Sequence, residues 1–456
     1  MASTCFEPIE VWKRLHSPEI ESLGPAFRAL RSDLYFLWWQ ALRSGAPSLA
    51  ARAYLLRDLW RARATPPQRG VTFDLADVVF VVQYPKPAGL GTLKPVENEV
   101  RKRGARTQFW VLPGATEALR LLGQDAMEPS QQIVDLTGFS RRPTLGEFRE
   151  ARADSSALLD ALALTGTTPR WLGSLATALF LRFHTLCRRL SEAVTWPQKM
   201  VFHNDFPTSV AAVSTAAPRS TIRLTLQHGI PSREQTPPLA PWYGVWGPYY
   251  ETFFRTGDTE TVSLGCPRFD TYADLRPTPI PTGPRNRILL LGQPVTPDLN
   301  PRVRHDVGEL ARSLLAARAG FRVTLRLHPS DSTGTQAFQR IQSLQIESPG
   351  ARGLRDAVRE ADFVVATPTT GLVEAILLGT PACAFCPPTL DAQVARALPP
   401  VVPRATSPAE VIALAEEVNN NREEWITTRR QLLCETAIWH VGSAAQRVTD
   451  WLDRRS

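Results

Sequence analysis

Apolar positions along the chain follow two spacings, one typical of helices and the other typical of buried strands. Up to about residue 65 they recur every three to four positions, as in FRALRSDLYFLWWQALRSG at 27–45, and this period predicts amphipathic helices. From residue 76 onward, short and almost continuous apolar runs are separated by segments with a helical period. Strands that are apolar throughout belong to parallel sheets with helices on both faces, so the pattern predicts an α/β fold.

The apolar runs fall into two groups, which predict two parallel sheets. The first group consists of the runs at 76–84, 107–114, 199–205 and 221–229. The second group consists of the runs at 287–294 and 322–329, followed by helix, strand, turn, helix and strand within 354–385. Residues outside these runs are predicted to be mostly helical at 115–195, 303–319 and 409–452.

The first two strands are joined by the stretch PAGLGTL at 87–93. It lacks the third glycine of a dinucleotide-binding fingerprint, and no acidic residue ends the second strand, so no dinucleotide site is predicted. We expect Gly89 and Gly91 to lie in a loop that precedes a helix at 93–103.

A proline-rich stretch separates the two groups of strands. Residues 230–284 show little periodicity, and 277–284 hold four prolines in eight residues, so we place the crossing between two domains there. The expected fold is α/β, with two Rossmann-like domains that face a cleft. The expected segments are an N-terminal helical segment, the two domains and a C-terminal helix, at 1–65, 66–276, 285–430 and 431–456.

The net charge of +8 favours anionic partners, such as nucleotides, nucleic acid or an anionic membrane surface. No arginine- and lysine-rich tract has the length of a nucleic-acid-binding tail, so no nucleic-acid partner is predicted. The aromatic residues of 27–45 are flanked by Arg28, Arg31 and Arg43. This helix could contact a membrane surface or pack on a neighbouring domain, and such faces more often pack.

Neither the N-terminus nor the cysteines indicate export. The start around Phe6 is too polar for the core of a signal peptide, and no run reaches the ~18 apolar residues of a membrane span. Cys383 and Cys386 form a Cys-x-x-Cys pair, but they lie in a run typical of a buried strand, without a second ligand pair nearby. We expect reduced thiols, no metal, and a cytoplasmic protein that is either free or peripheral on the inner face of the plasma membrane.

Polar residues gather where the predicted strands end. Ligands bind at the carboxyl ends of the strands in open parallel sheets, so these residues are expected to line one cleft. In the first domain they are His203-Asn204-Asp205 and Gln227-His228-Gly229. In the second domain they are Gly292-Gln293, His328-Pro329 and the stretch from Thr367 to Gly371.

The stretch ATPTTGLVEAILLGTP at 366–381 predicts an anion site. A strand ends at its first alanine and a helix begins near Gly371, so backbone N–H groups and the helix dipole would meet an anion there. Thr367, Thr369 and Thr370 add hydroxyl donors. Capping of the helix accounts for one threonine and not for all three.

Two further side chains are expected near this anion site. His328 ends the preceding long strand and is pinned by Pro329, which would direct its imidazole into the cleft, so that His328 and the threonine turn hold one diphosphate or phosphodiester between them. Glu374 lies one turn into the helix. It either accepts a hydrogen bond from a ribose hydroxyl or is a first-turn carboxylate on the helix dipole.

The motif LRLHPSD at 325–331, followed about forty residues later by ATPTTGLVEAILLGTP, resembles the donor half of GT-B glycosyltransferases. It is most similar to bacterial capsule and lipopolysaccharide enzymes that use CMP-activated acidic sugars (sialic acid or Kdo), and the CDP-glycerol-using polymerases of wall teichoic acid share the pattern. The run at 226–270 resembles the middle of capsule-type polysaccharide transferases. In these families an HP motif and a Ser/Thr motif grip the nucleotide phosphate, which implies His328, Thr369 and Thr370 here. Threonine replaces the usual serine pair, and the acceptor motif of the sialyltransferases is not evident.

The resemblance implies a GT-B-like enzyme that transfers a sugar from a nucleotide-sugar donor to a polysaccharide or lipid-linked acceptor. The domain at 66–276 would take the acceptor and the domain at 285–430 the donor. No DxD-like motif is evident, so the reaction is expected to need neither a metal nor another cofactor. The residues expected to contact the donor nucleotide or sugar are Gly292, Gln293, Arg326, Glu374 and Arg268.

An inverting transferase needs a base that deprotonates the acceptor hydroxyl, and this base should lie in the first domain, opposite the donor phosphate. His228 ranks first because an unperturbed imidazole titrates near pH ~6.5. Asp205 ranks second; it could orient His228, act as the base, or only cap the next helix. Asp270, close to Arg268, is more readily explained by a structural turn.

Three other functions fit the same fold. One is a nucleotide-sugar 2-epimerase, which needs acids and bases around one sugar ring and no acceptor groove. Another is a CDP-polyol phosphotransferase. The last is a non-catalytic protein that kept the GT-B-like fold for binding, which becomes the better hypothesis if Asp205 and His228 do not face the cleft.

Overall fold

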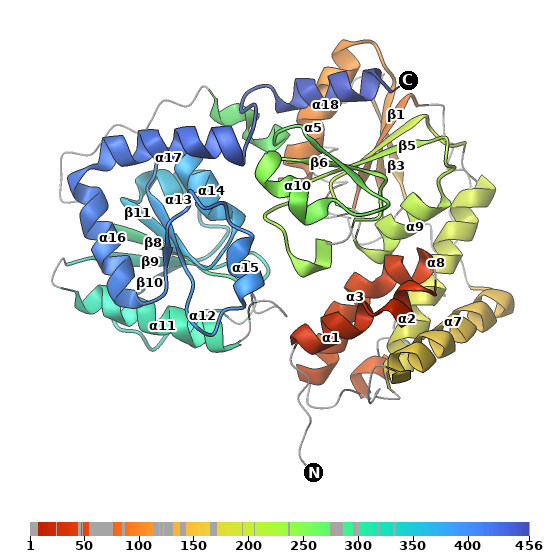
Figure 1. Cartoon of the computed structure of the whole chain (residues 1–456), viewed down its shortest axis with the longest axis horizontal. Helices are drawn as coiled ribbons and strands as arrows, with labels where there is room; N and C mark the ends of the chain where they lie inside the picture. The colour runs from red at the N-terminus through yellow and green to blue at the C-terminus, as the bar shows by residue number, and fades with distance from the viewer. Residues whose placement is uncertain are drawn as a thin grey trace.

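The computed structural model describes residues 8–23, 25–43, 47, 49–53, 76–83, 87–112, 118, 122, 131–136, 143–164, 171–193, 195–204, 206–235, 238–273, 286–294, 299, 301–317, 320–331 and 334–455. Within these residues the chain forms two parallel sheets, each surrounded by helices, with further helices at the N-terminal end (Figure 1). The prediction of an α/β protein with two Rossmann-like domains and an N-terminal helical segment is therefore confirmed.

The first sheet has seven strands in the order β3-β2-β1-β4-β5-β6-β7, and all its ladders are parallel. Its strands are β1 (Val78–Val82), β2 (Thr107–Val111), β3 (Gln131–Asp135), β4 (Lys199–Phe202), β5 (Ile222–Leu226), β6 (Trp242–Val245) and β7 (Glu260–Ser263). The helices in this part of the chain are α5 (Pro87–Lys102), α7 (Leu145–Leu164), α8 (Leu172–Ala193), α9 (Thr208–Ala216), α10 (Pro248–Phe254), η1 (Arg233–Gln235) and η2 (Pro267–Tyr272). The chain moves outward from β1 to β3 and then returns to β4, so the strand order reverses between β1 and β4.

The second sheet has six parallel strands in the order β10-β9-β8-β11-β12-β13. Its strands are β8 (Arg287–Leu291), β9 (Arg322–Arg326), β10 (Gln345–Glu347), β11 (Phe363–Ala366), β12 (Ala382–Phe385) and β13 (Arg404–Ala405). Its helices are α11 (Pro301–Ala316), α12 (Gly334–Phe338), α13 (Leu354–Glu360), α14 (Thr370–Leu377), α15 (Ala392–Arg396), α16 (Pro408–Asn420) and α17 (Arg422–Thr436). Here the order reverses between β8 and β11. Such reversals open a crevice at the carboxyl ends of the strands, where ligands bind in open α/β sheets.

The N-terminal helices α1 (Pro8–Leu15), α2 (Pro18–Glu21) and α3 (Pro25–Arg43) pack on α7, α8 and α9. Tyr35 and Trp38 of α3 are both 0% exposed and belong to the core that these helices share with the first sheet. Asp33 of α3 accepts a hydrogen bond of 2.9 Å from the amide of Thr208, at the start of α9. The aromatic face of 27–45 is thus used for packing, the more frequent of the two alternatives. None of the helices in the described part of the chain has the length and apolar character that a bilayer crossing requires.

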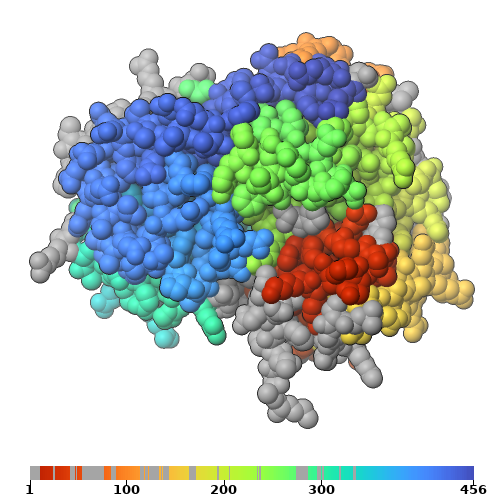
Figure 2. Space-filling model, viewed as in Figure 1, coloured from red at the N-terminus to blue at the C-terminus, as the bar shows by residue number. Residues whose placement is uncertain are grey.

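The C-terminal end of the chain crosses back to the first domain (Figures 1 and 2). The helix α17 packs on α14 in the second domain, whereas α18 (Ala444–Asp453) packs on α5. Arg103 forms ion pairs of 2.5 Å with Asp450 and 2.6 Å with Asp453 of α18. The helical segment expected at 409–452 is therefore three helices, and they are divided between the two domains.

Two predictions about regular structure need correction. The helix expected at 93–103 begins earlier, at Pro87, so Gly89 and Gly91 lie in its first turns and not in a loop. Proline suits the first helical position because it needs no hydrogen-bond acceptor there. The segments 115–195 and 230–284 also contain strands, namely β3, β6 and β7.

Each missed strand has a weak sequence signal for a physical reason. The strands β3 and β7 are the two edges of the first sheet and carry polar residues. The strand β6 contains Gly244, and glycine weakens a strand pattern. A Cβ at this position would lie 3.0 Å from Leu226 and 3.0 Å from Leu264, so the neighbouring strands fill the space that a side chain would need.

Replacement of Trp38 by Ala tests the packing of the N-terminal helices. Because this side chain is fully buried, we expect the free energy of unfolding to fall by ~3–5 kcal/mol, measured by chemical denaturation. Leu145→Ala is the control, because Leu145 is 65% exposed and its truncation should change stability by less than ~0.5 kcal/mol. Equal effects of the two substitutions would contradict the packing of α3 into the core.

Candidate active site

The carboxyl ends of β4 and β5 bring two histidines together in the first domain. The two strands are parallel neighbours, with Phe202 opposite Thr225, and His203 and His228 follow immediately after them in the chain. The Nδ1 atom of His228 lies 3.1 Å from Nε2 and 3.3 Å from Nδ1 of His203. The strands that precede Asp205 and His228 in the chain are thus adjacent, and it is His203 that contacts His228.

The two histidines differ in their surroundings. His203 is 4% exposed, whereas His228 is half-buried. Burial, together with the neighbouring charges of His228 and Arg268, holds the pKa of His203 well below its usual range. His203 is therefore a neutral imidazole near neutral pH, and His228 is the more exposed of the two.

The turn after β5 is fixed by the side chain of Gln227. Its amide nitrogen donates a hydrogen bond of 2.8 Å to the carbonyl of Gly229. Its amide oxygen accepts one of 2.9 Å from the backbone of Trp246 on the neighbouring strand end. The Trp246 indole donates a further bond of 3.0 Å to the Gln227 carbonyl. These bonds hold the backbone around His228 in one conformation.

This turn also touches the second domain. The amide of Ile230 donates a hydrogen bond of 3.2 Å to the hydroxyl of Thr370, the first residue of α14. A Cβ at position 229 would lie 3.0 Å from the same hydroxyl, so glycine permits this close approach. The loop that carries the predicted base is therefore in direct contact with the predicted phosphate-binding turn.

The threonine turn has the backbone that the sequence predicted. Thr369 is the N-cap of α14, and its side chain makes no capping hydrogen bond. Thr367 is buried at 2% exposure. A Cβ at Gly371 would lie 2.7 Å from Leu291, which explains why no side chain fits there. Helix capping therefore does not explain the presence of the Thr369 hydroxyl. The hydroxyl of Thr370 takes part in the contact between the domains.

The carboxyl end of β8 lies between the ends of β9 and β11, at the reversal point of the second sheet. Gly292, Gln293 and Thr367 line one pocket there, together with Arg304 from α11. A Cβ at Gly292 would lie 3.1 Å from the Arg326 carbonyl, so the glycine allows β8 to close against β9. His328 follows β9 and the threonine turn follows β11, on either side of β8, and strands two places apart in a sheet are separated by about 10 Å.

The stretch LRLHPSD, which includes the end of β9, orients the imidazole of His328 and holds the guanidinium of Arg304. The Nδ1 atom of His328 accepts a hydrogen bond of 3.1 Å from the amide of Ser330. A neutral imidazole that accepts at Nδ1 carries its proton on Nε2, which is therefore a donor. Asp331 forms an ion pair of 2.7 Å with Arg304, the cation that lines the pocket. The Ser330 amide thus orients His328, and the Asp331 carboxylate holds Arg304.

Two residues expected to contact the donor are engaged by the protein itself. Arg326 pairs with Glu347 and donates bonds of 3.0 Å and 2.6 Å to the carbonyls of Pro349 and Arg352. Glu374 forms an ion pair of 2.9 Å with Arg268 of the first domain, with side chains 11% and 17% exposed, respectively. Neither of the two sequence alternatives for Glu374, a ribose contact or a dipole carboxylate, included this partner.

Several functional candidates could not be recognised in the sequence. His203 stood among the strand-end residues, but nothing in the pattern joined it to His228. Arg304 lies in the first turn of a helix, three residues after the proline that begins it, and belongs to no motif. Arg233 of η1 pairs with Asp391 of the second domain at 2.6 Å. Asp205, the second base candidate, lies outside the described residues.

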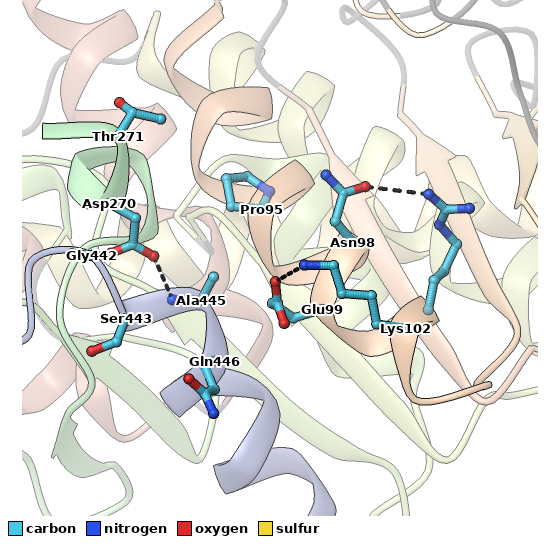
Figure 3. A pocket seen from close by; sticks show the side chains of 11 residues that line it. Pro95, Asn98, Glu99, Lys102, Asp270, Thr271, Gly442, Ser443, Ala445 and Gln446 are labelled. Atoms are coloured by element: carbon cyan, nitrogen blue, oxygen red, sulfur yellow. Dashed lines mark hydrogen bonds and ion pairs between the residues drawn. The ribbon is translucent and has the colours of Figure 1, made fainter. Parts of the chain in front are cut away.

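A larger groove, of about 680 Å³, lies away from the strand ends, between α5, η2 and α18 (Figure 3). Its charged side chains are paired locally, as in the Lys102–Glu99 ion pair of 2.6 Å. Asp270 accepts hydrogen bonds of 3.0, 3.0 and 2.8 Å from the amides of Gly442, Ala444 and Ala445, and so caps α18. Volume alone does not make this groove the reactive site, because Lys102, Glu99 and Asp270 are already engaged in an ion pair and in helix capping.

Cysteine and metal chemistry find no support in the described part of the chain. Cys383 is buried in β12, and burial raises its thiol pKa far above the usual range. Burial also raises the pKa of Cys386 to about 11. Among the described residues there is no cluster of three or more His, Cys, Asp or Glu side chains that could hold a metal ion.

Known proteins resemble the chain in structure and not in sequence. No protein-family model and no curated protein sequence matches it. A UDP-GlcNAc 2-epimerase from Neisseria meningitidis, solved with UDP-GlcNAc, is 12% identical with a TM-score of 0.53, over 83% of this chain and 99% of its own. A putative UDP-N-acetylglucosamine 2-epimerase from Listeria monocytogenes is 13% identical with a TM-score of 0.51, over 83% and 96%. The glycotransferase of kitacinnamycin is 12% identical with a TM-score of 0.50, over 84% and 100%.

The fold is GT-B-like. At such identities the structural likeness establishes the fold alone, and the GT-B-like arrangement expected from the sequence is confirmed. The same fold hosts sugar transfer and sugar epimerisation, so the function of this chain has to be inferred from its own site.

The Arg268–Glu374 pair should couple the stabilities of the two domains. Removal of one charge from a buried pair leaves the other uncompensated, so Arg268→Gln or Glu374→Gln should each cost ~3–5 kcal/mol of stability, reduced somewhat by the residual exposure. The double substitution should cost clearly less than the sum of the two. Thermal and chemical unfolding of the four proteins measures this coupling, and strictly additive effects would contradict it.

Proposed function

We propose that the protein is a glycosyltransferase that moves a sugar from a nucleotide-activated donor to a surface polysaccharide or glycolipid. The observation that carries this proposal is the contact between the His228 loop and the threonine turn. The Ile230 amide and the Thr370 hydroxyl are 3.2 Å apart, so a base and an anion-binding turn border the same part of the cleft. A transferase needs these two groups on opposite sides of the anomeric carbon.

The proposed reaction is a direct displacement. His228 takes the proton of the acceptor hydroxyl as its oxygen attacks the anomeric carbon, and the bond from this carbon to the donor phosphate oxygen breaks. The departing nucleotide keeps the bonding electrons, and its charge is stabilised by the Nε2–H of His328, the Thr369 hydroxyl and the N-terminus of α14. Attack opposite the leaving group inverts the configuration. The residues lining the pocket around Gly292 and Gln293 would hold the nucleotide.

We further propose a CMP-linked acidic sugar, such as Kdo or a sialic-acid-like sugar, as the donor. This rests on the likeness of the LRLHPSD and threonine motifs to capsule and lipopolysaccharide enzymes. The proposed contact for the sugar carboxylate is Arg268, which lies beside His203 at the domain boundary and would have to share its guanidinium between this carboxylate and Glu374. The acceptor would enter on the side of the first domain, and contact with a membrane surface would bring a lipid-linked acceptor close.

A nucleotide-sugar 2-epimerase is the second candidate, favoured by the likeness of the fold to two such enzymes. Epimerisation at a carbon needs a base strong enough to act on a C–H bond, with carboxylates or imidazoles around one sugar ring. In the described part of the cleft the groups at hand are two histidines, threonine hydroxyls and the Arg268–Glu374 ion pair. Incubation with UDP-GlcNAc in deuterated water would reveal epimerisation as deuterium in the recovered sugar, and such incorporation would replace the transferase proposal.

Donor binding is tested by thermal shift with CMP, CDP, UDP, GDP and ADP and by the substitution His328→Ala. We expect CMP to raise the melting temperature most; a larger effect of UDP would overturn the choice of nucleotide. Hydrogen bonds to charged groups contribute ~1.5–3 kcal/mol, so His328→Ala should weaken nucleotide binding ~10- to 150-fold and remove most turnover. The matched control is His305→Ala, since the His305 side chain is 72% exposed on α11.

The base is tested by His228→Ala and, separately, Asp205→Asn. Loss of a general base costs ~10²–10⁴ in rate, so His228→Ala should lower turnover by that factor. Nucleotide affinity should be nearly unchanged, because the base contacts the acceptor and not the donor. If both variants keep full turnover with the correct donor and acceptor, the base assignment is wrong. If the wild type turns over no CMP-, CDP- or UDP-linked donor, a binding function becomes the better proposal.

A further inference from the structure

The contact between His203 and His228 has an unusual geometry. The ring centroids lie 4.5 Å apart and the ring planes meet at 78°. The Nδ1 atom of His228 is almost equally distant from the two nitrogens of His203, at 3.1 Å and 3.3 Å. The lone pair of an imidazole nitrogen lies in the ring plane, so one atom cannot meet both nitrogens along their lone pairs. The edge of His228 therefore faces the ring of His203, as in edge-to-face aromatic pairs.

An edge-to-face contact favours one protonation pattern. The face of a neutral aromatic ring is electron-rich and attracts N–H groups and cations. The Nδ1 of His228 is then best occupied by a proton that points at the His203 face. In a neutral imidazole with its proton on Nδ1, the basic nitrogen is Nε2. After proton uptake the imidazolium still directs its Nδ1–H toward the same neutral face.

His203 is held in place by the first turns of α5. A Cβ at Gly89 would lie 3.2 Å from Nδ1 of His203, which is tighter than ordinary van der Waals contact. A Cβ at Gly91 would lie 3.6 Å from Cγ of Arg268, an ordinary contact distance. Gly89 of PAGLGTL thus lets α5 pack closely against His203, whereas a side chain at Gly91 would fit beside Arg268.

Burial, and after it the charges of two neighbours, keep His203 neutral. The titratable and charged groups that act on it are His228 from the end of β5 and Arg268 from η2. Behind Arg268 lies Glu374 from α14, which is already paired with the guanidinium at 2.9 Å. Protonation of His203 would place a buried cation between His228 and Arg268, which low solvation and like charge both oppose.

We propose that His203 is a positioning residue whose neutral ring face orients His228 and fixes its proton on Nδ1. The inference rests on the proposed role of His228 as the base. His203 itself exchanges no proton in the reaction: the acceptor hydroxyl proton moves to Nε2 of His228, and the Nδ1 proton stays where it is. Close packing of α5 at Gly89 keeps the His203 ring in position, and the nearby charge of Arg268 helps to keep it neutral.

A spectroscopic test needs no substrate. In the whole protein with ¹⁵N-labelled histidine, the ring nitrogens of His228 should show the Nδ1–H form, whereas histidine in water prefers Nε2–H. His203 should stay neutral from pH 5 to 8, while His228 titrates. Loss of the ring in His203→Ala should return His228 to the water-like form. The ring of His203→Phe offers an aromatic face without a titrating nitrogen and should retain the Nδ1–H form.

Kinetics of a matched glycine pair test the same inference without changing either histidine. Both Gly→Ala substitutions lie in the first turns of α5 and have similar effects on helix propensity. Only Gly89→Ala crowds His203, so it should lower turnover by about tenfold to 100-fold, because small misplacements of a catalytic group cost up to ~10² in rate. Gly91→Ala should stay within about twofold of the wild type. Nucleotide affinity should be unchanged in both variants.

The outcomes separate this inference from the proposed function. Titration of His203 between pH 5 and 8, or an Nε2–H form of His228 in the wild type, would overturn the inference. So would full turnover of His203→Ala alongside an inactive His228→Ala, which would leave the proposed base intact. Full turnover of His228→Ala would instead remove the proposed base itself. If the ring face orients His228, His203→Phe should have a higher turnover than His203→Ala, whereas His203→Gln should not.

Discussion

The hydrogen bond from the Ile230 amide to the Thr370 hydroxyl, 3.2 Å long, is the contact on which the arrangement of the site depends. It joins the loop after β5 to the first residue of α14, and so connects two sheets that share no strand. The absence of a side chain at Gly229 allows this approach, since a Cβ there would lie 3.0 Å from the hydroxyl. At this point of the domain boundary the contact consists of one backbone amide and one hydroxyl.

Charge reinforces this boundary from both sides of the cleft. The Arg268–Glu374 pair, at 2.9 Å, and the Arg233–Asp391 pair, at 2.6 Å, each join a cation of the first domain to a carboxylate of the second. The Tyr249 hydroxyl adds bonds of 2.5 Å and 2.9 Å to the carbonyls of Arg396 and Leu398. Desolvation makes such groups costly unless both partners are present, so they favour one relative placement of the domains over many. The C-terminal helix α18 packs on the first domain and is capped there by Asp270, so the chain links the two domains a second time and favours the same placement.

The reversal of strand order explains why the site lies where it does. In the first sheet the order reverses between β1 and β4, next to His203, and in the second between β8 and β11, next to Gly292 and Thr367. Both crevices open at the carboxyl ends of the strands, and the contact between the domains brings them face to face. The larger groove beside α5 has no such topological basis, and its Lys102, Glu99 and Asp270 are already engaged. The shared fold with epimerases and a glycosyltransferase is therefore less informative about chemistry than the side chains that end these strands.

The sequence by itself determined the fold class and the identity of most strand-end residues. Continuous apolar runs predicted the central strands, and ATPTTG predicted a helix start that the structure places at Thr370, because strand ends and helix caps are set by local chemistry. The edge strands β3 and β7 escaped prediction because they bury too little apolar surface. The strand β6 escaped prediction because neighbouring leucines fill the space beside its glycine. Only the tertiary structure brought His203 against His228, gave Glu374 to Arg268 and engaged Arg326 with Glu347. These partners lie 21 to 106 residues apart in the chain, and no local pattern encodes a contact that depends on how two sheets and their loops pack.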